Sequence, residues 1–237
     1  MKRKKKNVFK GYGFFGIFLI LLAETGIYIN TNSINILPFL AYKVSVWATP
    51  VCWWGYILIV DALIYRIKGS SLLTVRSRDF ILQVFLSVIF WLLFEIYNLH
   101  MDNWKYVGWP KNNIELAFGL VISFATIMPA MFLTAELLEC TGIFKNLKIS
   151  KLNITGRFLN RMILMGFIFV IVPLLLKRDI ARYLFILVWT GYIFLLEPVN
   201  YSSGGNSLLR DLGNGYLPKI ACLFVSGYIC GFLWEFW

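Results

Sequence analysis

The 21 residues 53–73, WWGYILIVDALIYRIKGSSLL, place one carboxylate, that of Asp61, inside a run of apolar side chains. A run of about 20 such residues is long enough to cross the hydrocarbon core of a bilayer as a helix. An acidic side chain costs about 3 kcal/mol at the centre of a membrane helix, and it usually faces the interior of a helix bundle. This stretch therefore predicts a membrane-spanning helix whose acid, Asp61, faces the interior of the bundle and has a structural or functional role.

The composition of the whole chain is typical of integral membrane proteins. Of the 237 residues, 59% are hydrophobic and only 15% are charged, whereas soluble domains carry about a quarter charged residues. We predict an all-α fold, a polytopic transmembrane helix bundle with about seven spans. The predicted spans cover about residues 11–29, 47–66, 80–99, 114–138, 159–176, 180–198 and 219–237.

The basic residues are distributed as they are in membrane proteins. The formal net charge is +11, and with the N-terminus inside, 17 of the 23 Lys and Arg residues lie on the cytoplasmic side and six on the other. This is the positive-inside pattern. We therefore predict a multi-pass protein of the cell membrane with a cytoplasmic N-terminus. Its basic residues would contact the lipid bilayer, and we expect no nucleic-acid partner.

Much of the opening stretch returns later in the chain. A shift of 136 positions aligns residues 53–73 with 189–209 at nine identities, and Asp61 falls on Glu197. A matching register of Trp, Gly, Tyr, acid and Ser does not arise easily from apolar composition alone, so it predicts an internal duplication. Both copies end in Gly-x-Ser-Leu-Leu, which predicts a helix-ending glycine and then a serine that starts a short helix.

A second, shorter match pairs two further acids. With four more residues of offset, LFEIY (93–97) falls on LWEFW (233–237), so that Glu95 aligns with Glu235. The matched helices cross the membrane in the same direction under the predicted topology. We therefore predict two parallel repeats, related by an axis along the membrane normal, with a functional site at their interface.

The repeat predicts the division of the chain into domains. Residues 1–140 form the first repeat of four helices, residues 141–158 a cytoplasmic loop, and residues 159–237 a second repeat of three helices. The second repeat lacks its last helix. We therefore expect either a naturally shortened protein or a membrane partner that supplies the missing helix. A homo-oligomer is the alternative to a membrane partner.

Polar and aromatic residues near the outer ends of the third and seventh spans predict a ligand site. We expect the carboxyl and amide groups to bind a ligand or exchange protons with it, and the indole rings to form the walls of the pocket. The alternative is an interfacial aromatic belt in which the acids only bind neighbouring helices. The candidate residues are Glu95, Asn98, Glu235, Trp91 and Trp234.

A second polar layer is predicted nearer the cytoplasmic side. It comprises Asp61, Glu197, Tyr56 and Tyr192, which occupy matched positions in the two copies. The layers would lie roughly 15–20 Å apart at 1.5 Å per helical residue. They therefore cannot form a single carboxylate pair.

Other features favour structural roles. Pro129 predicts a kink in the fourth span. Glu136 and Glu139 are expected to form a solvated charge cluster with Lys145 and Lys148. The chain holds one histidine and four cysteines without C-x-x-C spacing, and no nucleotide-binding or catalytic motif. We therefore expect no metal and no cofactor.

Several motifs together carry a family resemblance. WWGYILIVDALIY, GSSLL, WLLFEIYNL, NWKYVGWP and FLWEFW resemble a group of uncharacterised bacterial polytopic membrane proteins. A much fainter resemblance is to membrane lycopene cyclase domains, carried by NWKYVGWPKNNIELAFGL with Glu115 near that family's acidic motif. The cyclase family's Pro-x-Glu-Glu is absent as such. The cyclase resemblance implies a duplicated helical unit around an isoprenoid.

Three functions follow from these observations. The first is the binding, and the transport, of a small or lipid-like ligand between the two repeats. The second is an enzyme that transforms an isoprenoid or lipid in the membrane, with a carboxylic acid as proton donor and aromatic faces that stabilise a cation. The third is a structural or assembly subunit of a membrane complex, in which the polar residues serve helix packing.

Overall fold

The computed structural model describes residues 7–108 and 110–237 and confirms the predicted all-helical membrane fold. Within these residues, seven helical segments are long and apolar enough to cross a bilayer. All seven match the predicted spans to within a few residues at each end. They are Gly11–Thr31, Ala48–Lys68, Ser77–Met101, Asn113–Thr141, Gly156–Leu175, Arg178–Ser202 and Pro218–Phe236.

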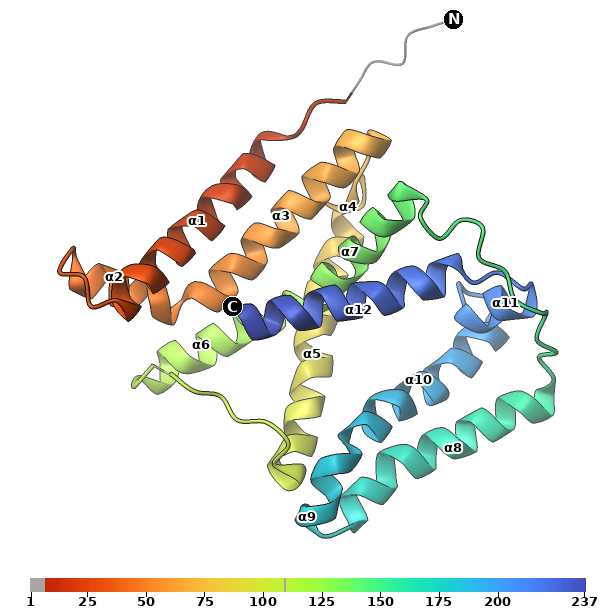
Figure 1. Ribbon diagram of the computed structural model, residues 1–237. Coiled ribbons are helices and arrows are strands. Elements are labelled where there is room, and N and C mark those ends of the chain that lie inside the picture. Colours follow the sequence, from red (N-terminus) through yellow and green to blue (C-terminus); the bar gives the residue numbers. More distant parts are fainter. Residues whose placement is uncertain (1–6, 109) are drawn as a thin grey trace, which may run out of the picture. The chain divides into compact units, whose positions relative to one another are not determined.

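The helices of the described chain are numbered in sequence order in Figure 1. The long helices are joined by short ones, and Arg182–Leu184 form one turn of 3₁₀ helix. Their bounds are α1 Gly11–Thr31, α2 Pro38–Val46, α3 Ala48–Lys68, α4 Leu72–Val75, α5 Ser77–Met101, α6 Asn113–Phe124, α7 Ile127–Thr141, α8 Gly156–Leu175, α9 Arg178–Ala181, α10 Phe185–Ser202, α11 Leu208–Gly213 and α12 Pro218–Phe236.

Contacts divide the chain into two compact units, which differ from the predicted domains. Unit 1 comprises the described residues of Met1–Trp91, Val107–Ile143 and Cys222–Trp237, and unit 2 comprises Leu92–Tyr106 and Phe144–Ala221. Helix α5 contributes its first part to unit 1 and its last part to unit 2. Most of α12 packs with unit 1. The predicted boundaries of the repeats, and the duplication itself, stay predictions.

In unit 1, helices α1 and α3 lie side by side because glycines let their backbones approach closely (Figure 1). A Cβ atom placed on Gly16 would lie 2.5 Å from the carbonyl oxygen of Gly55, and one on Gly55 would lie 2.7 Å from that of Gly16. Small residues at helix crossings are the usual means of packing in a bilayer, where burial of apolar side chains against lipid gives little driving force.

Unit 2 contains a similar crossing between α8 and α10. A Cβ atom on Gly166 would lie 3.0 Å from the carbonyl oxygen of Gly191, and one on Gly191 would lie 3.1 Å from that of Gly166. Gly191 aligns with Gly55 in the 136-residue shift. Both units therefore use a glycine at this aligned position to bring two membrane helices together.

The fourth span is broken near the predicted proline kink. Helix α6 ends at Phe124 and α7 begins at Ile127, so the break lies at the residue four positions before Pro129, where a proline ring disrupts the helix. The Ser87 hydroxyl from α5 donates to the Phe124 carbonyl oxygen at 2.5 Å and accepts from the Met128 amide at 3.0 Å. This serine supplies partners to backbone groups that lipid could not satisfy.

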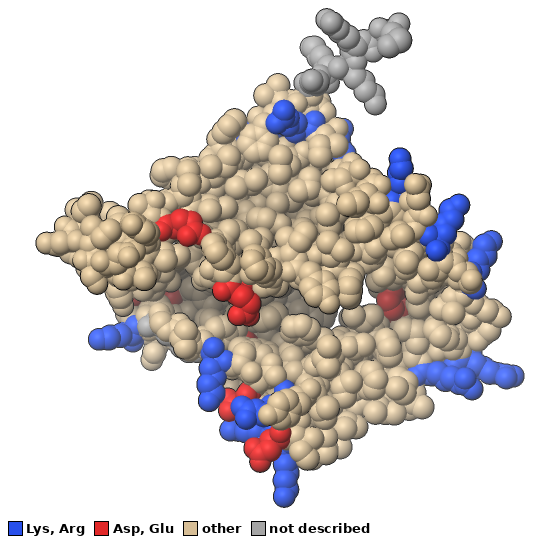
Figure 2. All heavy atoms as spheres, viewed as in Figure 1, with Lys and Arg blue, Asp and Glu red and all other residues tan. Residues whose placement is uncertain are grey.

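The surface of the described chain is largely apolar. Many large hydrophobic side chains are exposed on the long helices, including Phe14, Phe85, Leu164 and Phe224. Figure 2 shows that acidic and basic side chains occupy only small parts of the visible face. Such a surface fits a lipid bilayer as the surroundings of the protein.

Candidate functional site

Asp61 is fully buried in unit 1, where it holds the short helix α4 against α3. Its Oδ1 accepts a hydrogen bond from the Leu73 amide at 2.9 Å, and its Oδ2 accepts from the Ser71 hydroxyl at 2.7 Å. A third donor, the Tyr12 hydroxyl of α1, lies 2.6 Å from Oδ2. The carboxyl group therefore connects three segments of the chain through hydrogen bonds, as a buried polar group requires.

Glu197 has the corresponding arrangement in unit 2. Its Oε1 accepts from the Leu208 amide at 2.7 Å, and its Oε2 accepts from the Ser207 hydroxyl at 3.0 Å. Leu208 is the first residue of α11, and Ser207 is the residue that caps it. The aligned acids thus bind the aligned serines and the first turns of aligned short helices.

The serine and glycine of the shared motif behave largely as predicted. Ser71 and Ser207 each precede a short helix, and Gly69 ends α3 with a left-handed backbone at φ 80°. In the second copy the left-handed glycine is Gly204, at φ 79°, one position before the aligned Gly205. The left-handed glycine is therefore shifted by one residue and the helix end by two, and the acid–serine contact is kept.

Glu95 and Asn98 bind the loop that follows α5. Glu95 Oε1 accepts from the Trp104 indole nitrogen at 3.2 Å and from the Tyr106 hydroxyl at 2.5 Å. The Asn98 side chain accepts from the main-chain amides of Asn103 and Trp104, and it donates to the Trp104 carbonyl oxygen at 3.0 Å. Both predicted ligand-binding residues thus position residues 103–106 of unit 2.

The two predicted tyrosines make different contacts. In unit 1 the Tyr56 hydroxyl lies 2.8 Å from the Thr134 hydroxyl of α7. In unit 2 the Tyr192 hydroxyl lies 3.3 Å from that of Tyr97 in α5. Tyr56 therefore links α3, the helix of Asp61, to α7. Tyr192 links α10, the helix of Glu197, to α5.

Trp91 and Trp234 do lie together, in a cluster of aromatic rings in unit 1. Their ring centroids are 6.2 Å apart, and Trp234 lies 5.6 Å from Trp53. Trp53 also lies 5.6 Å from Tyr56 and 5.4 Å from Trp237. We call these five side chains the aromatic cluster. It draws on α3, α5 and the C-terminal segment that includes α12.

The aromatic cluster contains a buried donor with no acceptor. The Trp53 side chain is 2% exposed, and its indole nitrogen has no hydrogen-bond partner among the described residues. A buried polar group without a partner costs about 1–3 kcal/mol, and native proteins keep few of them. Trp234 and Trp237 are only partly buried.

An acid that the sequence reasoning missed lies beside the cluster. Glu24 of α1 accepts a hydrogen bond from the Trp237 indole nitrogen at 2.9 Å. It lies seven residues before the end of its span, which is about 10 Å along the helix axis. An acidic side chain at such depth is a functional candidate by default. The same argument that selected Asp61 would have selected Glu24, but Glu24 has no aligned acid.

The remaining predicted acids lie apart from the cluster or serve ion pairs. Glu235 is exposed on α12 in unit 1, whereas Glu95 belongs to unit 2, so a cavity shared by the two stays a prediction. Glu115 forms an ion pair with Lys43 at 3.0 Å. Glu136 pairs with Lys68 and Arg76, which replace the lysines that the sequence suggested.

The groups at the aromatic cluster are aromatic rings, an indole N–H and a carboxylate. The described residues contain no group of three or more His, Cys, Asp or Glu arranged to hold a metal ion. The cluster offers aromatic faces, one unpaired N–H donor and one nearby carboxylate. These groups suit a largely apolar molecule that carries an oxygen acceptor.

Comparisons with known proteins identify no relative of this chain. No family model, curated protein or solved structure matches the chain. The candidate site is therefore defined by its geometry alone.

Proposed function

We propose that this multi-pass membrane protein binds, and moves, a small lipid-like ligand at the aromatic cluster of unit 1. The observation that carries the proposal is the buried indole N–H of Trp53, which has no acceptor among the described residues. In a bilayer no water replaces a missing partner, so the unpaired donor is more costly than at a protein surface. An oxygen atom of a bound ligand would satisfy it.

The surroundings of Trp53 define the class of ligand. The rings of the cluster give a large apolar contact area, which favours a hydrocarbon or isoprenoid body. Glu24 can accept a hydrogen bond from a hydroxyl group. The ligand would therefore be an apolar molecule with a hydroxyl or carbonyl oxygen, such as an isoprenoid alcohol.

This assignment changes the roles of the residues that the sequence suggested. Trp91 and Trp234 remain walls of the site. Glu95 and Asn98 act through the loop they position, and Glu24 takes the place of Glu235 as the carboxylate beside the ligand. Movement of the ligand across the membrane is the further part of the proposal, since membrane acids with aromatic neighbours are typical of substrate pathways.

The test uses farnesol as the probe and Trp53→Phe as the key variant. The purified full-length protein in detergent is titrated with farnesol, and the shift in thermal unfolding gives the affinity, because a ligand that binds the folded state stabilises it. Phenylalanine keeps an aromatic ring and removes the N–H. Loss of one hydrogen bond of about 1.4 kcal/mol weakens binding roughly tenfold.

Trp54→Phe is the matched control, because Trp54 follows Trp53 in α3 but packs against Phe80 outside the cluster. We expect this variant to bind farnesol like the wild type, and Glu24→Gln to bind more weakly. Equal affinities of the wild type and Trp53→Phe, or no saturable shift with the wild type, would contradict the proposal.

A structural or assembly role is the second candidate, and the contacts of Trp237 favour it. The main-chain oxygen of Trp237 accepts from the Thr49 hydroxyl at 2.6 Å, while its indole donates to Glu24. These bonds tie the last described residue to α1 and α3. Under this candidate, Glu24→Gln would speed hydrogen exchange at residues 230–237 and no variant would respond to farnesol.

A further inference from the structure

Unit 2 contains a cleft between α8 and α10 that shares no residue with the aromatic cluster. Its volume is about 590 Å³, within the range of small-molecule sites. The cleft lies between the first two turns of α8 and the last turns of α10, beyond the crossing at Gly166 and Gly191. Its lining residues are Gly156, Leu159, Asn160, Ile163, Pro198, Val199, Ser202 and Ser203.

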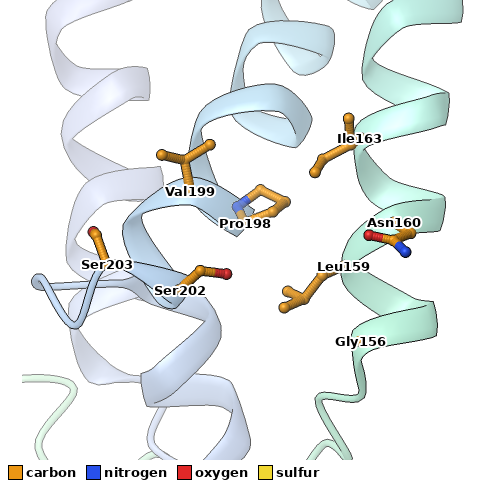
Figure 3. Close-up of a pocket in the computed structure, with 8 residues that line it drawn as sticks. All are labelled: Gly156, Leu159, Asn160, Ile163, Pro198, Val199, Ser202 and Ser203. Carbon is orange, nitrogen blue, oxygen red and sulfur yellow. The ribbon is translucent and has the colours of Figure 1, made fainter.

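The lining combines an apolar wall with polar groups at one level. Figure 3 shows Leu159, Ile163 and Pro198 facing the gap, with the hydroxyl of Ser202 directed into it and Asn160 lying on α8 with its amide oxygen on the side of the gap. Ile163 lies seven residues into α8, which corresponds to a depth of about 10 Å. The cleft thus reaches from the end of the span into the apolar layer of the bilayer.

The end of unit 2 at which the cleft opens is strongly basic. In the segments that flank the cleft, residues 144–161 and 203–221, the sequence holds seven Lys and Arg residues and one acid, Asp211. Six of the seven basic side chains are exposed, and Lys219 is partly buried. The basic residues are Lys145, Lys148, Lys151, Arg157, Arg161, Arg210 and Lys219.

We propose that this cleft binds an anionic phospholipid of the surrounding bilayer. The basic residues attract the negatively charged headgroup, since a basic side chain near an anionic membrane surface contributes about 1 kcal/mol. The Ser202 hydroxyl donates to an oxygen of the glycerol region, and the Asn160 amide lies at the same level on α8. Leu159, Ile163 and Pro198 contact the upper part of an acyl chain. The charge of the opening distinguishes this lipid from a zwitterionic one.

The test compares phosphatidylglycerol with phosphatidylcholine of the same acyl chains. The full-length protein, purified in a neutral detergent, is mixed with each lipid, and native mass spectrometry measures the bound fraction. We expect the wild type to retain more phosphatidylglycerol than phosphatidylcholine. Ile163→Trp, which fills the cleft, should lose this binding. Ile168→Trp adds the same volume on an exposed part of α8 and should keep it.

A second pair of variants tests the charge. Arg157→Gln, next to the lining residue Gly156, should weaken phosphatidylglycerol binding roughly fivefold, by the contribution of one basic side chain. Lys177→Gln, two residues beyond the far end of α8, should leave it unchanged. Thermal unfolding of each variant checks that it is folded. Equal retention of the two lipids by the wild type, or undiminished binding by folded Ile163→Trp, would overturn the proposal.

Discussion

Replacement of Asp61 by alanine is expected to destabilise unit 1 strongly. The carboxylate is 0% exposed and accepts from the Ser71 hydroxyl, the Leu73 amide and the Tyr12 hydroxyl. A hydrogen bond to a charged group contributes about 1.5–3 kcal/mol, and each buried donor left without a partner adds a penalty. Because Tyr12 and Ser71 can turn to other acceptors, we expect a net loss of about 3–5 kcal/mol.

Glu197→Ala removes the acceptor of two donors and should cost less, about 2–3 kcal/mol. Asp79→Ala is the control, because Asp79 is an exposed acid in the first turn of α5, where loss of a helix-dipole contact costs about 0.5 kcal/mol. Denaturant unfolding in detergent, followed by tryptophan fluorescence, measures the three changes in free energy of unfolding.

Amide hydrogen exchange shows which short helix each substitution releases. Asp61→Ala should speed exchange of the amides in residues 71–76 and leave residues 207–213 protected, and Glu197→Ala should do the reverse. Exchange would then report the release of α4 or α11 separately. If Asp61→Ala were as stable as Asp79→Ala, or if both short helices exchanged equally fast in either variant, the reasoning about these acids would be refuted.

Three further changes test contacts within unit 1 and in the loop after α5. Ser87→Ala removes the hydroxyl that bridges the broken fourth span and should lower the free energy of unfolding by about 2–4 kcal/mol. Ser123→Ala loses only a bond within its own helix and should cost under about 1 kcal/mol in the same denaturant assay. Gly55→Ala would place a Cβ 2.7 Å from a carbonyl oxygen and should separate α1 from α3, seen as a lower thermal midpoint, while Gly231→Ala, with nothing within 4 Å, should not. Asn98→Ala should make the loop after α5 more sensitive to proteolysis, and an unchanged cleavage rate would contradict its role there.

The sequence predicted the spans well because the bilayer imposes length and hydropathy on each helix. It also predicted a kink at Pro129, since proline cannot continue the helical bonding, and the structure has a break between α6 and α7 near this residue. The partner at the break was not predictable, because Ser87 lies about 40 residues away and nothing in its local pattern distinguishes it. Contacts between distant helices are set by packing, which hydropathy does not record.

The candidate site was predictable only in part. Asp61 and Glu197 were selected as a polar layer, and the spacing of ten residues to the following serine in both copies was a signal for their contacts. Glu24 was missed because it has no aligned acid. The unpaired donor of Trp53 is a property of three-dimensional packing, so no sequence pattern could have indicated it.

Photo-crosslinking tests the central claim, a ligand site at the aromatic cluster, most directly. The full-length protein in nanodiscs is irradiated with a diazirine analogue of farnesol, and mass spectrometry locates the labelled peptides. We predict label on residues 50–56 and 232–237 that excess farnesol removes and that Trp53→Phe reduces. Label spread evenly over lipid-exposed helix faces, such as that around Phe85 in α5, with no competition by farnesol, would contradict the claim.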